Sequence, residues 1–143
     1  MYFAKGHTTG RWLNHHFHKG MPRGFAAANI ERLVPGVTGA CLAIRREVYE
    51  SVGGFTEDYI IGDYEDSDLC LKVRRAGFDI AYVPSSELYH FERQSIRKSE
   101  DYMRGSADRY NGWLHATRWA DAMAALMETA PTNTAAPHLR SAA

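Results

Sequence analysis

The clearest hydrophobic pattern in the chain lies in the segment YEDSDLCLKVRRA, which spans residues 64–76. At a period of about 3.6 residues this segment predicts one amphipathic helix. The apolar stripe of that helix consists of Leu69, Cys70, Val73 and Ala76. Asp66 falls in the middle of the stripe and Glu65 at its edge. A carboxylate that faces the buried side is unfavourable unless it is paired, hydrogen-bonded or functional, so Asp66 requires an explanation.

Two interpretations of Asp66 follow from its place at the start of the helix. In the first, Asp63 is the N-cap and Asp66 the third helical residue of an acidic capping box, at the positive end of the helix dipole. In the second, Asp66 is a general base at the rim of a cleft and faces a substrate hydroxyl. The two are compatible, because Asp63 can cap the helix while Asp66 acts. Asp68 forms an i, i+4 pair with Lys72 on the exposed side and is predicted to be structural.

The patterns before this helix predict a long loop, a strand and a short helix. Residues 5–35 are rich in glycine and basic residues, and they predict a loop with at most a short helical turn near 26–31. The apolar run over 37–44 predicts a buried strand. Residues 45–52 predict a short helix that ends at Gly53.

The patterns after this helix predict a short strand and a long helical segment. The strand covers residues 80–83 and is stopped by Pro84. Residues 99–127 predict one long helix or two, with Ser99 as a candidate cap. The predicted apolar stripe of this segment consists of Met103, Tyr110, Leu114 and Thr117. The tail over 129–143, rich in alanine, proline and threonine, is predicted to be disordered.

Composition narrows the class of protein. The chain has 143 residues, 17 basic and 17 acidic side chains and a hydrophobic fraction of 45%, which is typical of one globular domain. The balanced charge argues against a nucleic-acid partner, and no apolar run reaches the length of a transmembrane segment. Without a signal peptide, the chain is expected to be cytoplasmic and at most peripheral to the inner face of a membrane. Cys41 and Cys70 are expected to be buried free thiols, with a disulfide as the alternative.

Several short motifs follow one another along the middle of the chain. They are Gly53-Gly54-Phe55, Glu65-Asp66-Ser67-Asp68-Leu69, Arg75-Ala76-Gly77-Phe78, Tyr82-Val83-Pro84 and Tyr89-His90. Together with residues 37–55, this series resembles the C-terminal half of a family 2 glycosyltransferase domain with the GT-A fold. The resemblance implies an α/β protein with a partial GT-A, nucleotide-diphospho-sugar transferase-like three-layer sheet. The half-domain is expected to cover residues 1–95. A helical extension follows over 96–128, and the tail covers 129–143.

The resemblance also implies a function. The expected reaction is the inverting transfer of a sugar from a nucleotide-diphospho-sugar donor to an acceptor hydroxyl, in glycan or cell-surface polysaccharide synthesis. Asp66 is then the catalytic base, and Glu65 orients the loop or contacts the donor. The implied substrate-binding residues are Thr38, Gly39, Ala40 and Asp63. His90 is the implied ligand of a divalent metal, Mg²⁺ or Mn²⁺, which neutralises the leaving nucleoside diphosphate.

The family carries a D-x-D metal motif in its N-terminal half, and none precedes Val37 here. We therefore expect a truncated piece that lacks most of the donor site. An exposed sheet edge would favour self-association or pairing with a complementing chain. Two alternatives stay open. One is a catalytically inactive fragment or interaction module, and the other is a small metal-binding protein built on the loop histidines His15, His16 and His18 together with His90. A glycosidase is disfavoured, because adjacent Glu65 and Asp66 cannot flank a glycosidic bond at the required ~5–9.5 Å.

Overall fold

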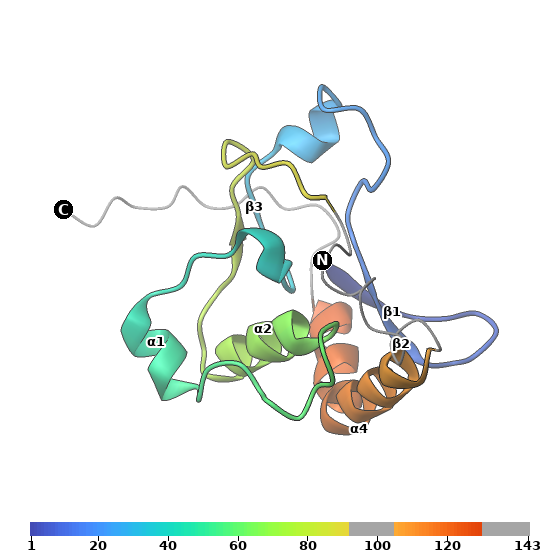
Figure 1. Cartoon of the computed structure of the whole chain (residues 1–143). Helices are drawn as coiled ribbons and strands as arrows, with labels where there is room; N and C mark the ends of the chain where they lie inside the picture. The colour runs from blue at the N-terminus through green and yellow to red at the C-terminus, as the bar shows by residue number, and fades with distance from the viewer. Residues whose placement is uncertain (92–104, 130–143) are drawn as a thin grey trace.

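The computed structural model of the chain describes residues 1–91 and 105–129 and has a mixed α/β architecture (Figure 1). The strands are β1 (Tyr2–Lys5), β2 (Trp12–His15), β3 (Arg32–Leu33) and β4 (Ala81–Tyr82). The helices are α1 (Arg46–Ser51), α2 (Glu65–Arg75) and α4 (Ser106–Thr129), and the short 3-10 helices are η1 (Ala26–Asn29) and η2 (Gly39–Cys41). The expected α/β class is therefore confirmed.

The strands form two small antiparallel sheets. In the first, β1 pairs with β2 and Tyr2 lies opposite His15; in the second, β3 pairs with β4 and Arg32 lies opposite Tyr82. Both sheets have two strands within the described residues, so the predicted three-layer sheet is not confirmed. Each strand keeps one edge without a strand partner in this part of the chain, while self-association through such an edge stays a prediction.

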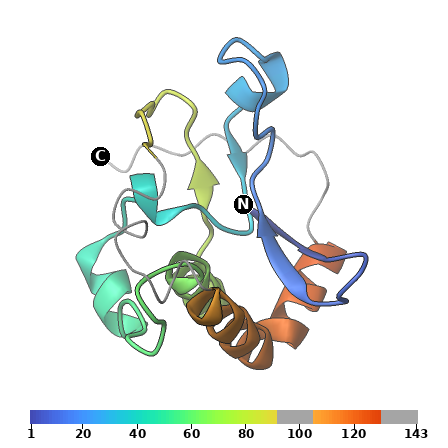
Figure 2. The ribbon, with the colours of Figure 1, turned by 45° about the vertical axis from the view of Figure 1, so that its right-hand side comes forward.

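Helix α2 packs against other elements on two sides. Leu69 and Val73 join Val48 of α1 in one hydrophobic cluster. Leu71 belongs to a second cluster, whose other buried members are Phe3 of β1 and Trp119 and Met123 of α4. Figure 2 shows α4 running alongside α2 and reaching the β1–β2 hairpin. Because α2 has partners on both sides, it also buries Ser67, Asp68 and Leu71, which lie outside the predicted stripe, whereas Ala76 of that stripe is exposed.

The predicted buried strand over residues 37–44 is wrong. The segment contains η2 instead, and Gly39, Ala40 and Cys41 are exposed. The hydroxyl of Thr38 accepts a hydrogen bond from the backbone N–H of Ala40 at 3.4 Å, which caps the short helix. Cys41 is therefore exposed, contrary to expectation, whereas Cys70 is buried as predicted, and both thiols are free.

The predicted loop over residues 5–35 contains more structure than expected. Strands β2 and β3 lie within it, and η1 confirms the helical turn predicted near 26–31. Every residue of β2 is half-buried. The strand therefore does not alternate between buried and exposed side chains, which is the pattern by which hydropathy reveals a strand in a sequence. The strand is fixed by its pairing with β1 and its contact with α4.

Helix α4 confirms a long helix in the C-terminal third but buries a different face from the one predicted. The predicted stripe is wrong, since Tyr110 is 40% exposed and Thr117 is exposed. The buried residues are Ala107, Asn111, Gly112, His115, Trp119 and Met123. Several of these are polar or lack a large apolar side chain, so hydropathy alone did not reveal this face.

Other predictions about the C-terminal third lie outside the described residues. Ser99 and Met103 fall in the gap at 92–104, and the tail beyond residue 129 is likewise not described. The proposed domain boundaries stay predictions. In the part of the chain that the structure describes, no helix is both long and apolar enough to cross a membrane.

Candidate active site

The acidic helix α2 begins in a strained loop instead of a capping box. Its N-cap is Tyr64, with φ of 74°, and no side chain caps the helix there. Asp63 precedes the cap with φ of 69°, and Ile61 has φ of 67°. The predicted N-cap at Asp63 is therefore wrong. Left-handed conformations of non-glycine residues cost roughly 1–3 kcal/mol each and persist only where surrounding contacts enforce them.

Asp66 connects the start of α2 to the η2 turn. Its Oδ2 atom accepts a hydrogen bond from the backbone N–H of Gly39 at 3.0 Å, and its Oδ1 atom accepts one from the backbone N–H of Ser67 at 2.7 Å. The fold thus brings the predicted base next to the predicted substrate-binding residues Thr38, Gly39 and Ala40. A carboxylate offers about four lone-pair positions, so these two bonds orient Asp66 and leave it able to accept a proton.

Glu65 is half-buried beside Asp66. Its Oε2 atom is buried and has no hydrogen-bond partner among the described residues. Burial raises the pKa of Glu65; a backbone hydrogen bond opposes that rise, and the charges of Asp66 and Asp63 add to it. A half-buried carboxyl with an unpartnered oxygen next to Asp66 is therefore a candidate for contact with a substrate.

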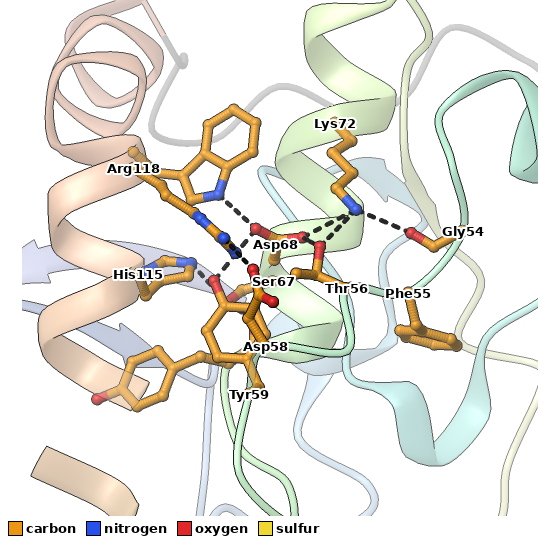
Figure 3. Close-up of polar contacts among 12 residues, drawn as sticks. Gly54, Phe55, Thr56, Asp58, Tyr59, Ser67, Asp68, Lys72, His115 and Arg118 are labelled. Carbon is orange, nitrogen blue, oxygen red and sulfur yellow. Dashed lines mark hydrogen bonds and ion pairs between the residues drawn. The ribbon is translucent and has the colours of Figure 1, made fainter. Parts of the chain in front are cut away.

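Asp68 is buried under the site, where only 1% of the residue is exposed. Its ion pair with Lys72 is present at 3.2 Å, but the prediction that the pair lies on the exposed side is wrong. The Oδ2 atom accepts a hydrogen bond from Thr56 at 2.6 Å. The Oδ1 atom accepts bonds from the Tyr59 hydroxyl at 3.1 Å and from Trp119 Nε1 at 2.7 Å. Figure 3 shows Lys72, Thr56 and Tyr59 converging on Asp68.

The environment of Asp68 determines its protonation. Burial by itself raises the pKa of this carboxyl, but the hydrogen bonds from Thr56 and Trp119 and the charge of Lys72 outweigh burial and hold the pKa below its ordinary value. Asp68 is therefore charged at neutral pH. Because it is enclosed and fully partnered, it acts as a structural anchor for the segment around the site.

The anchor extends to the glycine-rich turn that precedes α2. Lys72 Nζ donates hydrogen bonds to the carbonyl of Gly54 at 3.0 Å and to Thr56 Oγ1 at 2.6 Å (Figure 3). Gly54 has φ of 61°, and an added Cβ would lie 2.8 Å from the Tyr49 ring. Only glycine fits there. The turn and the acidic helix are therefore joined through one lysine.

A second buried hydrogen-bond network is centred on the hydroxyl of Ser67. Its hydroxyl donates to the carbonyl of Tyr64 at 3.0 Å, accepts from Asn14 Nδ2 at 2.9 Å and lies 2.8 Å from His115 Nε2. Because the hydroxyl proton is already donated, this network fits the neutral tautomer of His115 that carries its proton on Nε2. Burial lowers the pKa of His115 to about 4, and the nearby charge of Asp68 opposes this only in part.

We predict that the chain loses stability as the pH falls from about 6.5 to about 4. In that range the unfolded chain binds a proton at His115 and the folded chain does not, since its pKa is lowered from 6.5 to about 4. The part of the loss that comes from His115 should reach roughly 3 kcal/mol and level off below its folded pKa. Urea unfolding between pH of about 7 and about 4 measures it.

The matched variants for this prediction are His115→Gln and His7→Gln. Glutamine at position 115 can still donate to Ser67 but does not titrate, so most of the pH slope should disappear. His7 is exposed, and its replacement should leave the slope unchanged. An unaltered slope in His115→Gln would contradict the assignment.

A cavity of about 860 Å³ lies beside η2. Its walls are mostly apolar, and Thr38, Gly39 and Ala40 form part of them. Asp66 is not among the lining residues and reaches this wall through its hydrogen bond with Gly39. The size of the cavity lies within the usual range of small-molecule sites.

His90 is exposed and is not among the residues that line the cavity, although Leu88, two residues before it, is one of them. Among residues 1–91 and 105–129, no three or more His, Cys, Asp or Glu side chains are grouped to hold a metal ion. The described residues therefore do not complete a metal site. The loop histidines form no such group either, and a metal-binding role of His90 stays a prediction.

A comparison with protein families identifies the relationship. Residues 15–107, well over half of the chain, match the family model described as Glycosyltransferase like family 2. The chain belongs to this family. The resemblance inferred from the sequence motifs is confirmed, and the chain is a transferase by family.

Curated relatives of this family 2 glycosyltransferase chain are considerably longer. An N-acetylglucosaminyl-diphospho-decaprenol L-rhamnosyltransferase of Mycobacterium tuberculosis is 36% identical over 99 residues, which cover 62% of this chain and 32% of the relative. The O-antigen biosynthesis protein RfbC of Myxococcus xanthus is 35% identical over 82 residues, 54% of this chain and 6% of the relative. An uncharacterized protein, y4gI, of Sinorhizobium fredii is 37% identical over 92 residues, 56% of this chain and 10% of the relative. The chain thus spans about a third or less of these relatives, and no solved structure matches it.

The candidate site includes neighbours that the sequence patterns did not indicate. They come from α4 and are Asn111, His115 and Trp119, each bonded to the acidic segment or to the loop before it. All three lie beyond the end of the family match at residue 107. Their regular spacing of four residues was the one available signal, because it places them on a single helical face.

Proposed function

We propose that this chain takes part in the inverting transfer of a sugar from a nucleotide-diphospho-sugar donor to an acceptor hydroxyl, in the synthesis of a glycan or cell-surface polysaccharide. The observation that carries the proposal is the position of Asp66, held by two backbone N–H groups at the start of α2 and against the cavity wall at Gly39. The names of two relatives, a rhamnosyltransferase and an O-antigen biosynthesis protein, support the substrate class.

In this reaction the acceptor oxygen attacks the anomeric carbon once. A bond forms between that oxygen and the anomeric carbon as the bond to the donor phosphate breaks, and the leaving nucleoside diphosphate takes the electron pair. The attacking hydroxyl must also lose its proton. We assign the proton to Asp66, whose remaining lone pairs can accept it.

The neighbouring residues take supporting roles in the proposal. Glu65, which is half-buried and has an unpartnered Oε2 atom among the described residues, would contact the donor or orient the loop. The η2 turn, with Thr38, Gly39 and Ala40 in the cavity wall, would allow close approach of a sugar, since glycine and alanine project little beyond the backbone. Asp63, in the loop directly before α2, would contribute to substrate binding.

The metal forms a separate part of the proposal. A divalent ion bound with the help of His90 would neutralise the leaving nucleoside diphosphate. Because the described residues do not complete a metal site, its further ligands would have to come from outside them. No step of the proton transfer described above depends on this ion.

The decisive experiment is a calorimetric titration of the purified chain with UDP and dTDP, each with and without Mn²⁺. We expect one nucleotide to bind in the presence of Mn²⁺, more weakly to His90→Ala and equally well to His7→Ala, in which an exposed histidine serves as the control. Binding without any effect of Mn²⁺ or of His90→Ala would remove the metal from the proposal. Absence of heat with every nucleotide would instead favour an interaction module that needs a complementing chain.

A further inference from the structure

We propose that α4 positions the acidic segment of the active site, and that Asn111 is the positioning residue that holds the loop at 60–64 in its strained shape. The proposal rests on the proposed function in one respect, since Asp66 is taken as the catalytic base. It adds a helix that lies almost entirely beyond the family match, which ends at residue 107.

Asn111 is fully buried and uses both ends of its side-chain amide on this loop. Its Oδ1 atom accepts the backbone N–H of Ile60 at 2.9 Å, and its Nδ2 atom donates to the carbonyl of the same residue at 3.0 Å. Nδ2 also donates to the carbonyl of Gly62 at 2.7 Å. One side chain therefore pairs with the backbone much as a neighbouring strand would, and it does so directly before the acidic helix.

The loop needs such a restraint. Ile61, Asp63 and Tyr64 all have positive φ, and none of them is a glycine. A chain segment in this conformation relaxes toward ordinary angles unless its surroundings hold it. Because Glu65 and Asp66 follow without a linker, relaxation of the loop would move the start of α2 and both carboxylates.

Gly112 supports the same assignment through a different observation. Glycine weakens a helix interior relative to alanine, yet it occupies a buried position of α4. An added Cβ at this position would lie 3.2 Å from the Tyr64 hydroxyl and 2.7 Å from Arg11 Nη2. The absent side chain leaves room for Tyr64, the N-cap residue of α2, so adjacent residues of α4 serve the same loop.

The rest of this helical face continues the pattern. His115 bonds to Ser67 and Trp119 bonds to Asp68; Figure 3 shows His115 facing Ser67 of α2. From one face of α4, Asn111 therefore contacts the loop at 60–64, and His115 and Trp119 contact the first turn of α2. The next residue on that face, Met123, packs with Phe3, Leu71 and Trp119. Its side chain carries no amide that could bond to the loop at 60–64, so it is a control for loss of packing without loss of the hydrogen bonds that Asn111 makes.

The experiment compares Asn111→Ala with Met123→Ala in the full chain by nuclear magnetic resonance. In Asn111→Ala we expect amide hydrogen exchange at Ile60 to accelerate at least ~10-fold more than at Leu69 in α2, because local opening of the loop no longer requires unfolding. The raised carboxyl pKa of Glu65 should also return toward its ordinary value. In Met123→Ala, exchange at both amides should rise together and the Glu65 pKa should stay raised. If Asn111→Ala does not fold, Asn111→Asp retains the acceptor for Ile60, loses the donors and supplies the same comparison.

Equal exchange at Ile60 and Leu69 in Asn111→Ala, with the Glu65 pKa unchanged, would overturn the proposal and leave Asn111 with a purely structural role. Turnover supplies the second readout: we expect kcat for sugar transfer to fall at least ~10-fold in Asn111→Ala, with donor KM little changed. A fall in kcat of the same size in Met123→Ala, with donor KM little changed, would also overturn the proposal. If the wild-type chain transfers no sugar, the proposed function fails, while the exchange and titration data still decide whether Asn111 positions the loop.

Discussion

Replacement of Asp68 by alanine is expected to lower the free energy of unfolding by about 3–5 kcal/mol, a large part of the stability of a small domain. The change leaves the half-buried ammonium of Lys72 and the buried N–H of Trp119 without the acceptor that they share. It also removes the partner of the Tyr59 hydroxyl. Urea unfolding followed by circular dichroism at neutral pH measures the loss.

Two further variants test whether the loss of stability comes from the buried hydrogen bonds of Asp68. Asp68→Asn keeps the shape and one acceptor oxygen, so its loss should be smaller than that of Asp68→Ala. Asp79→Ala removes a carboxylate that pairs with Arg74 and is 66% exposed, and it should change stability by less than about 1 kcal/mol. If Asp68→Ala were no worse than Asp79→Ala, the buried hydrogen bonds of Asp68 would not stabilise the fold.

The stabilisation from Asp68 also has a defined pH range. Its folded pKa lies below the ordinary value of 3.8, so the unfolded chain takes up the proton first as the pH falls. The contribution is present above that value and is lost as the pH falls through the folded pKa. This loss lies at more acidic pH than the one expected from His115, so the two can be separated.

Replacement of Asp66 by asparagine is expected to lower the rate of sugar transfer by at least ~100-fold, the range usual for loss of a general base. Asparagine can keep the hydrogen bond from Gly39 through its oxygen, but it cannot take the proton of an attacking hydroxyl. Stability should change by less than about 1 kcal/mol, because Asp66 is not enclosed as Asp68 is. The rate of nucleoside diphosphate release, measured with the donor found by calorimetry, tests this prediction.

The parallel variant Glu65→Gln separates the two adjacent carboxylates. Its effect on the transfer rate should be about 10-fold or less, since glutamine keeps the shape of the side chain and one oxygen that can accept a hydrogen bond from the substrate. A greater loss in Glu65→Gln than in Asp66→Asn would transfer the role of base to Glu65. Equal activity of Asp66→Asn and the wild-type chain would remove Asp66 from the mechanism.

Local signals in the amino-acid sequence are sufficient to predict several of the elements. Helix α2 and its end before Gly77, the short helix α1 and the strand at 81–82 lie where their patterns predict them. Gly77 has φ of 88°, as a glycine that ends a helix should. Periodicity and backbone preference act over a few residues, so they can be read without knowing the partners of a segment. The family followed from the order of such local motifs.

Which polar residues are buried, and which of them contact one another, depends on packing between distant segments of the chain. Hydropathy assigns Asp68, Asn111 and His115 to the surface, yet all three are enclosed because each finds hydrogen-bond partners on another element. Asp66 meets Gly39 across 27 residues of sequence, after a segment predicted as a strand folds as the η2 turn instead. Burial of a polar group becomes favourable only when a partner is in place, and that partner is set by the packing of α4 against α2, which no local pattern contains.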